Sequence, residues 1–135
     1  MPYYRMIIVA SNGSMMKTYA SANVLDEYTI MLTPKLDNIT KNSQEIFVHP
    51  EHKSSYINQI TTDKSIWTIF KSATETVNIY LELSKCWSSH ANKIIEEVYK
   101  SFCKYCIRNY TQGLDQPINN EKFDQEVKDV LSILQ

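Results

Sequence analysis

Glycine is scarce in this chain, with two residues in 135. Loops that cradle phosphate groups need glycine where the backbone must approach the ligand closely. The two glycines, Gly13 and Gly113, lie far apart in the sequence and form no such loop. The composition therefore excludes the glycine-rich nucleotide-binding fingerprints.

An excess of basic charge is also missing. Lys and Arg number 14 against 15 Asp and Glu, which gives a formal net charge of −1. Proteins that bind nucleic acid or anionic membranes usually carry a positive field. The charge balance argues against both classes, and we expect no nucleic-acid partner.

Cysteines and long apolar runs are few. Three cysteines are an odd, small number that does not describe a disulfide framework. The N-terminal apolar run, Met6 to Ala10, is too short for a signal sequence and far too short to span a bilayer. We therefore expect one cytosolic domain over residues 1–135, in a reducing compartment.

The chain does contain two stretches typical of antiparallel strand pairs. "RMIIVASNGSMMKTYASA" predicts a hairpin, because Asn12-Gly13 is a strong turn signal and Met6–Val9 is continuously apolar, as in a strand buried on both faces. "SIWTIFKSATETVNIYLELS" contains two further β-rich runs. In the second run, Val77–Leu83 alternates apolar and more polar residues, which predicts one buried and one wetter face.

Helical periodicity dominates the second half. "HANKIIEEVYKSFCKYCIRNY" predicts an amphipathic helix whose apolar stripe consists of Ile94, Ile95, Val98, Phe102, Cys106 and Ile107. A last helix is predicted to begin near Asn120, with Glu121 and Asp124 in its first turn, where the helix dipole favours acidic groups. Its stripe consists of Phe123, Val127, Val130, Leu131 and Leu134.

The region between the strand pairs has a weaker pattern. Thr33-Pro34 is a helix-start signal, since proline suits the first helical position. We predict a helix over about 34–48, followed by a loop at "HPEHKSS". The element order is then β-β-α-β-β-α-α, and the predicted fold class is α+β, an antiparallel sheet with helices packed on it.

Two groups of residues could be considered for a metal ion. Cys103 and Cys106 form a C-x-x-C, and together with Cys86 and His90 they could be written as a zinc set. Because the pair lies inside an amphipathic helix, we favour cysteines that act as small hydrophobic residues. In His49-Pro50-Glu51-His52 the proline disfavours a helix, and we expect a solvated loop.

No arrangement typical of an active site stands out. No serine stands in a Gly-x-Ser-x-Gly elbow. Carboxylates that could act as acid or base are scattered: Asp63, Glu82, Asp115 and Asp124. We therefore expect no catalytic residue, no cofactor and no metal, and a protein that is not an enzyme.

Residues 57–131 resemble a known family. "INQITTDKSIWTIFKSATETVNIYLELS" has an acidic turn, a strand, a tight turn and a second strand, and a helix ending "VYKSFCKYCIRN" follows. In "GLDQPINNEKFDQEVKDVL", after the helix-closing Asn109, come Pro117-Ile118 and then Phe123-Asp124, which opens the last helix. This pattern is similar to the small longin-fold subunits of the TRAPP vesicle-tethering complex, the synbindin type first and the sedlin type next. The chain departs from the family at Thr74-Glu75-Thr76, where glycine is frequent, and at Tyr110, where proline is frequent.

The resemblance implies a longin-like (profilin-like) sheet and a terminal helix that lies against its own domain. It also implies a non-catalytic subunit that contributes surfaces to a complex of ER-to-Golgi transport. Such complexes tether vesicles at the early Golgi and activate a Rab-family GTPase by nucleotide exchange. The expected partners are other TRAPP-like subunits and, through the assembly, the GTPase and the membrane, at ER-exit sites and the cis-Golgi.

Other modules stay open as alternatives. A clathrin-adaptor small subunit would share the longin fold. The regulatory domain of an R-SNARE would need a coiled coil and a membrane anchor after the domain, and we expect neither because the sequence stops at Gln135. A small zinc-binding or enzymatic domain that uses the cysteine–histidine set is the alternative from another class.

A surface for partners is predicted on the helix at 34–48. Its apolar residues are flanked by polar ones, which is typical of an interface with an apolar centre and a polar rim. In longin folds the first helix and the neighbouring sheet edge often meet other subunits. We therefore predict that partner contacts are among Leu36, Ile39, Ile46 and Phe47. The alternative is that this helix packs only on its own sheet.

Overall fold

The computed structural model describes residues 2–10, 15–24, 44–48, 56–72, 77–106 and 118–134. The strands are β1 (Tyr4–Ala10), β2 (Met15–Ala20), β3 (Gln44–Val48), β4 (Tyr56–Thr61), β5 (Ser65–Lys71) and β6 (Val77–Ser84). The helices are the 3₁₀ helix η2 (Lys85–His90) and the α-helices α3 (Ala91–Tyr105) and α5 (Glu121–Leu131).

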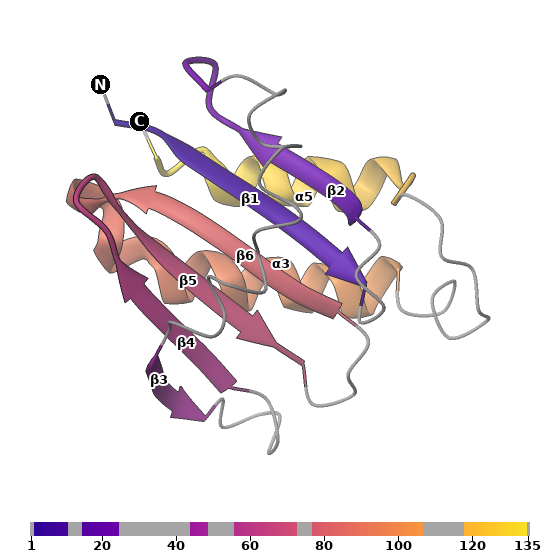
Figure 1. The fold of residues 1–135 in the computed structure, drawn as a ribbon. Helices are drawn as coiled ribbons and strands as arrows, with labels where there is room; N and C mark the ends of the chain where they lie inside the picture. The colour runs from indigo at the N-terminus through magenta and orange to yellow at the C-terminus, as the bar shows by residue number, and fades with distance from the viewer. Residues whose placement is uncertain are drawn as a thin grey trace.

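The strands form one antiparallel sheet in the order β2-β1-β6-β5-β4-β3 (Figure 1). β1 pairs with its hairpin partner β2 on one side and with β6 on the other, from Tyr4 opposite Leu83 to Ala10 opposite Val77. In Figure 1, α5 lies behind β1 and β2, and α3 lies behind β5 and β6. The coarse prediction, an α+β arrangement with helices packed on an antiparallel sheet, is confirmed.

The continuous apolar run of β1 is explained by its interior place in the sheet. Met6 and Ile8 belong to the core on the helix side, while Ile7 and Val9 belong to a cluster on the other face. None of the four is more than 5% exposed. The predicted hairpin and the burial on both faces are thus confirmed, and the turn residues Asn12-Gly13 lie outside the described residues.

The main core fills the space between the sheet and the helices. The predicted stripes are confirmed. The buried core contains Ile94, Ile95, Val98, Phe102 and Cys106 from the α3 region and Phe123, Val127, Leu131 and Leu134 from the α5 region, and half-buried Val130 packs against it. Ile107 lies outside the described residues. The rings of Phe102 and Phe123 meet edge to face with centroids 6.4 Å apart, an arrangement that aromatic pairs prefer. α5 is therefore packed on α3 as well as on the sheet.

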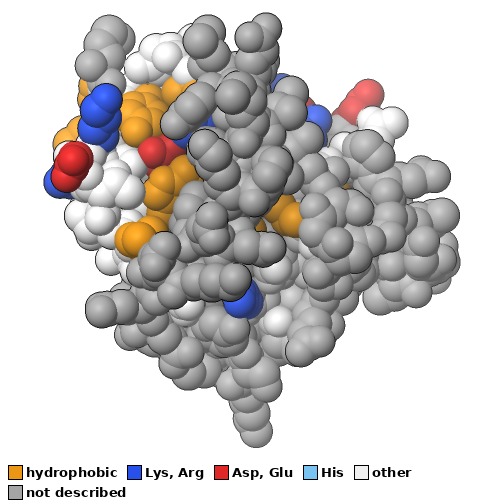
Figure 2. Space-filling view, viewed as in Figure 1, with side chains coloured by type: hydrophobic (Ala, Val, Ile, Leu, Met, Phe, Trp, Pro, Cys, Tyr) orange, Lys and Arg blue, Asp and Glu red, His pale blue; other side chains and the backbone are white. Residues whose placement is uncertain are grey.

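The second face of the sheet is buried too, which differs from the predicted wetter face of β6. Tyr80 is 4% and Glu82 is 6% exposed. β6 lies between β1 and β5, so the apolar body of Tyr80 packs with large side chains of both neighbours, and Glu82 is paired with Arg5. Figure 2 shows the molecule from this side, with basic and acidic side chains of the described residues scattered rather than gathered into a field of one sign.

The predicted helix over 34–48 is wrong at its C-terminal end, because Gln44–Val48 is strand β3. β3 pairs with β4, with Phe47 opposite Ile57 and a register shift between Glu45 and Phe47. Ile, Phe and Val are strong strand formers that pair well across a sheet, and this pairing outweighs a thin helical stripe. Residues 34–43 and the predicted loop at 49–55 lie outside the described residues.

Candidate functional site

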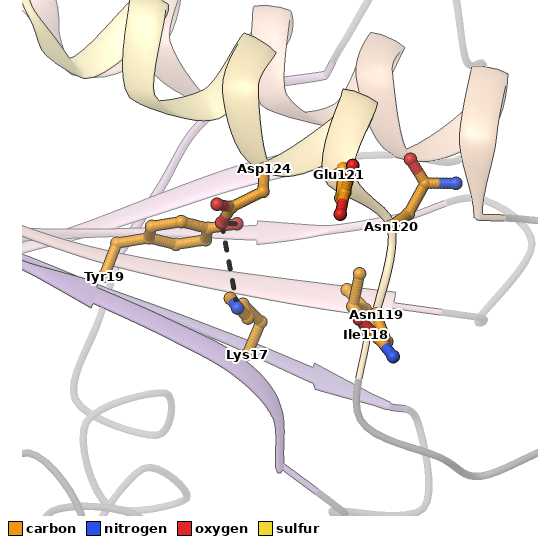
Figure 3. Close-up of a pocket in the computed structure, with 7 residues that line it drawn as sticks. All are labelled: Lys17, Tyr19, Ile118, Asn119, Asn120, Glu121 and Asp124. Atoms are coloured by element: carbon orange, nitrogen blue, oxygen red, sulfur yellow. Dashed lines mark hydrogen bonds and ion pairs between the residues drawn. The ribbon is translucent and has the colours of Figure 1, made fainter.

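A small hollow lies between β2 and the first turn of α5 (Figure 3). It is lined by Lys17, Tyr19, Ile118, Asn119, Asn120, Glu121 and Asp124. Its volume of about 90 Å³ is well below the roughly 300–1,000 Å³ typical of ligand pockets. The hollow has room for a few water molecules and not for a cofactor-sized ligand.

The sequence builds this hollow by holding the start of α5 against the edge of the sheet. Ile118 is buried, and its N–H donates to the carbonyl oxygen of Met16 over 2.9 Å. Asn120 is the N-cap, and its Oδ1 accepts a 2.9 Å hydrogen bond from the Phe123 N–H. The predicted start of the last helix near Asn120 is confirmed.

Asp124 is the polar centre of the hollow. Its Oδ1 accepts a 2.9 Å hydrogen bond from the Tyr19 hydroxyl and lies 3.7 Å from Lys17 Nζ, while its Oδ2 lies 2.9 Å from Lys128 Nζ. The hydrogen bond from Lys128 is the main cause that lowers the pKa of Asp124, with smaller contributions from Tyr19 and Lys17. Burial is the main cause that raises the pKa of Tyr19, and the hydrogen bond to the Asp124 carboxylate raises it further.

The pKa shifts of Tyr19 and Asp124 fit a structural hydrogen bond better than an acid–base pair. A tyrosine with a raised pKa keeps its proton and acts as a donor, and a carboxylate with a lowered pKa is a weak base near neutral pH. The Tyr19–Asp124 bond therefore joins β2 to α5.

A second polar group joins α3 to α5. Glu126 accepts a hydrogen bond from the Ser101 hydroxyl and a 3.0 Å bond from the Tyr105 hydroxyl, and Lys104 Nζ lies 3.6 Å away. The bond from Ser101, followed by that from Tyr105, lowers the pKa of Glu126. The carboxylate thus connects the two helices at the edge of their apolar contact.

A buried ion pair occupies the second face of the sheet. The guanidinium of Arg5 on β1 pairs with the Glu82 carboxylate on β6, and both side chains are under 10% exposed. Glu82 Oε2 also accepts hydrogen bonds from the Tyr3 hydroxyl at 2.9 Å and the Ser65 hydroxyl at 2.6 Å. These partners offset the cost of removing the Glu82 carboxylate from water.

The residues of the possible zinc set are not brought together. Cys86 is exposed in η2, His90 is the N-cap of α3, Cys103 is half-buried in α3, and Cys106 is its buried C-cap. Across the described ranges, no three His, Cys, Asp or Glu side chains are grouped so that they could hold a metal ion. Burial raises the pKa of the Cys106 thiol to about 11, which agrees with a small hydrophobic role.

The other candidates from the sequence do not converge. Asp63 lies in the turn between β4 and β5, Glu82 in the buried ion pair and Asp124 in the hollow. Asp115 and the His49–His52 stretch lie outside the described residues.

The four residues of the predicted partner surface do not all lie on one helix. Leu36 and Ile39 lie outside the described residues. Ile46 and Phe47 lie in β3, the last strand of the sheet order, so they cannot share one helical face with the other two. The prediction of one helix face is wrong for this pair, which instead lies at a sheet edge.

Sequence reasoning missed the polar groups that organise the fold. The signal for the buried pair is a charged residue inside an otherwise apolar strand, Arg5 before the β1 run and Glu82 within β6. Periodicity alone does not pair them, because Arg5 and Glu82 are 77 residues apart and meet only through the β1–β6 register.

Neither the known protein-family models nor the curated proteins contain a match to the chain. Within the described part, no helix is long and apolar enough to cross a membrane.

Proposed function

We propose that this chain is a non-catalytic, longin-like subunit of a TRAPP-type vesicle-tethering complex in ER-to-Golgi transport. In this role it contributes surfaces for assembly and for nucleotide exchange on a Rab-family GTPase. Its place is peripheral to ER-exit sites and the cis-Golgi, reached through the complex.

The docking of α5 on its own domain is the observation that carries the proposal. The resemblance implies a terminal helix of this kind, and α5 is held by buried Phe123, by the Asn120 cap and by the Tyr19–Asp124 bond to β2. The hairpin, the β5–β6 pair and the long helix α3 add support, because the resemblance implies each of them at these residues. β3 and β4 are additional to the predicted order.

The geometry of the described residues also suits a protein that presents surfaces. The polar groups with shifted pKa values join elements of the fold to each other: β2 to α5 and α3 to α5. The hollow beside Asp124 is too small for a cofactor. Ile46 and Phe47 lie in β3, the last strand of the sheet order. In longin folds, the first helix and the sheet edge next to that helix often meet other subunits. We therefore keep these residues, together with Leu36 and Ile39, as the proposed partner surface.

The size of the assembly in a lysate of the source cells tests the proposal. A monomer of 15.7 kDa elutes late in gel filtration, whereas a subunit of a tethering complex elutes with the complex. We expect the tagged wild-type chain in the large fraction, and elution of the chain as a monomer would contradict the proposal.

Charge substitutions then test the partner surface. Ile39→Asp and Phe47→Asp are each expected to shift the chain to the monomer fraction while its circular dichroism spectrum stays native. Ile133→Asp is the matched control, because Ile133 is 41% exposed and lies beyond α5; this variant is expected to stay in the complex. Unfolding of both substituted chains would identify Ile39 and Phe47 as core residues, and normal assembly of both would place the interface elsewhere. Either result overturns the proposed surface.

A further inference from the structure

We draw no further inference here: the strongest candidate, the hollow between β2 and the first turn of α5, rests on a helix N-terminus already capped by Asn120 and on an Asp124 carboxylate already bonded within the fold, and no second observation points to a ligand there.

Discussion

Truncation of Phe123 tests whether α5 is an integral part of the fold. The side chain is completely buried, and its ring contacts that of Phe102. Replacing a buried Phe by Ala typically costs about 3–5 kcal/mol through lost burial and the cavity left behind. Because domains are stable by only about 5–15 kcal/mol, Phe123→Ala should remove a large share of the free energy of unfolding.

The expected change in melting temperature follows from chain length. An unfolding entropy of about 2.1 cal/mol/K per residue gives about 0.28 kcal/mol/K for 135 residues. A loss of about 3–5 kcal/mol then lowers Tm by about 10–18 °C, measured by circular dichroism or calorimetry.

Lys122→Ala is the matched control for this experiment. Lys122 is the exposed neighbour of Phe123 on α5, so its truncation leaves the core intact. A surface change of this kind alters stability by no more than about 0.5 kcal/mol, or about 2 °C here. A Phe123→Ala melt within roughly 3 °C of wild type, on the same entropy scale, would refute the reasoning and make α5 peripheral.

Three further predictions concern the ion pair, the hollow and the thiols. Glu82→Gln removes the buried carboxylate that pairs with Arg5 and should lower the free energy of unfolding in urea by about 3–5 kcal/mol; a loss below about 1 kcal/mol would contradict the buried-pair description. Asp124 has a lowered pKa in the folded state, so its stabilisation is full above the ordinary value of 3.8 and is lost as pH falls through the folded-state value. The stability advantage of wild type over Asp124→Asn should therefore be larger at pH 7 than at pH 3. An advantage that does not change with pH would contradict a stabilising role of the ionised Asp124 carboxylate. Exposed Cys86 should react with a thiol reagent much faster than Cys106, because burial lowers access and raises the Cys106 pKa to about 11; equal labelling rates, read by peptide mass spectrometry, would show that Cys106 is accessible.

Elements with a strong local pattern could be predicted from the sequence. The stripes of α3 and α5 repeat at helical spacing over several turns, and their described residues lie in the core or, in the case of Val130, pack against it. The continuous apolar run in β1 predicts a strand buried on both faces because it places apolar side chains on both faces of the sheet. In these places local periodicity and burial agree.

The edge of the sheet could not be predicted in the same way. β3 follows a stretch with a helix-start signal, and β4 has Asn58 and Gln59 at its centre, which weakens its apolar alternation. β3 is held as a strand by its pairing with β4, and β4 by its pairing with both β3 and β5. These pairings cannot be read from either segment alone.

The side-chain hydrogen bonds and ion pairs between elements join residues that are distant in sequence. Tyr19 and Asp124 are 105 residues apart, and they meet because α5 packs behind β2. Neither residue lies in a motif that predicts the other. The alternation of residues in β6 predicted a wetter face, but Tyr80 and Glu82 on that face are buried. The reason is that β6 lies between β1 and β5, which local alternation does not reveal.

The identity of the proteins that co-purify with this chain tests its proposed role most directly. The tagged chain would be expressed at native level in the source cells, captured under mild conditions and analysed by quantitative mass spectrometry against a tag-only control. We expect near-equal amounts of several TRAPP-like tethering subunits, retained through a second purification step. Recovery of clathrin-adaptor large subunits in their place, or of the chain alone, would contradict the proposed role.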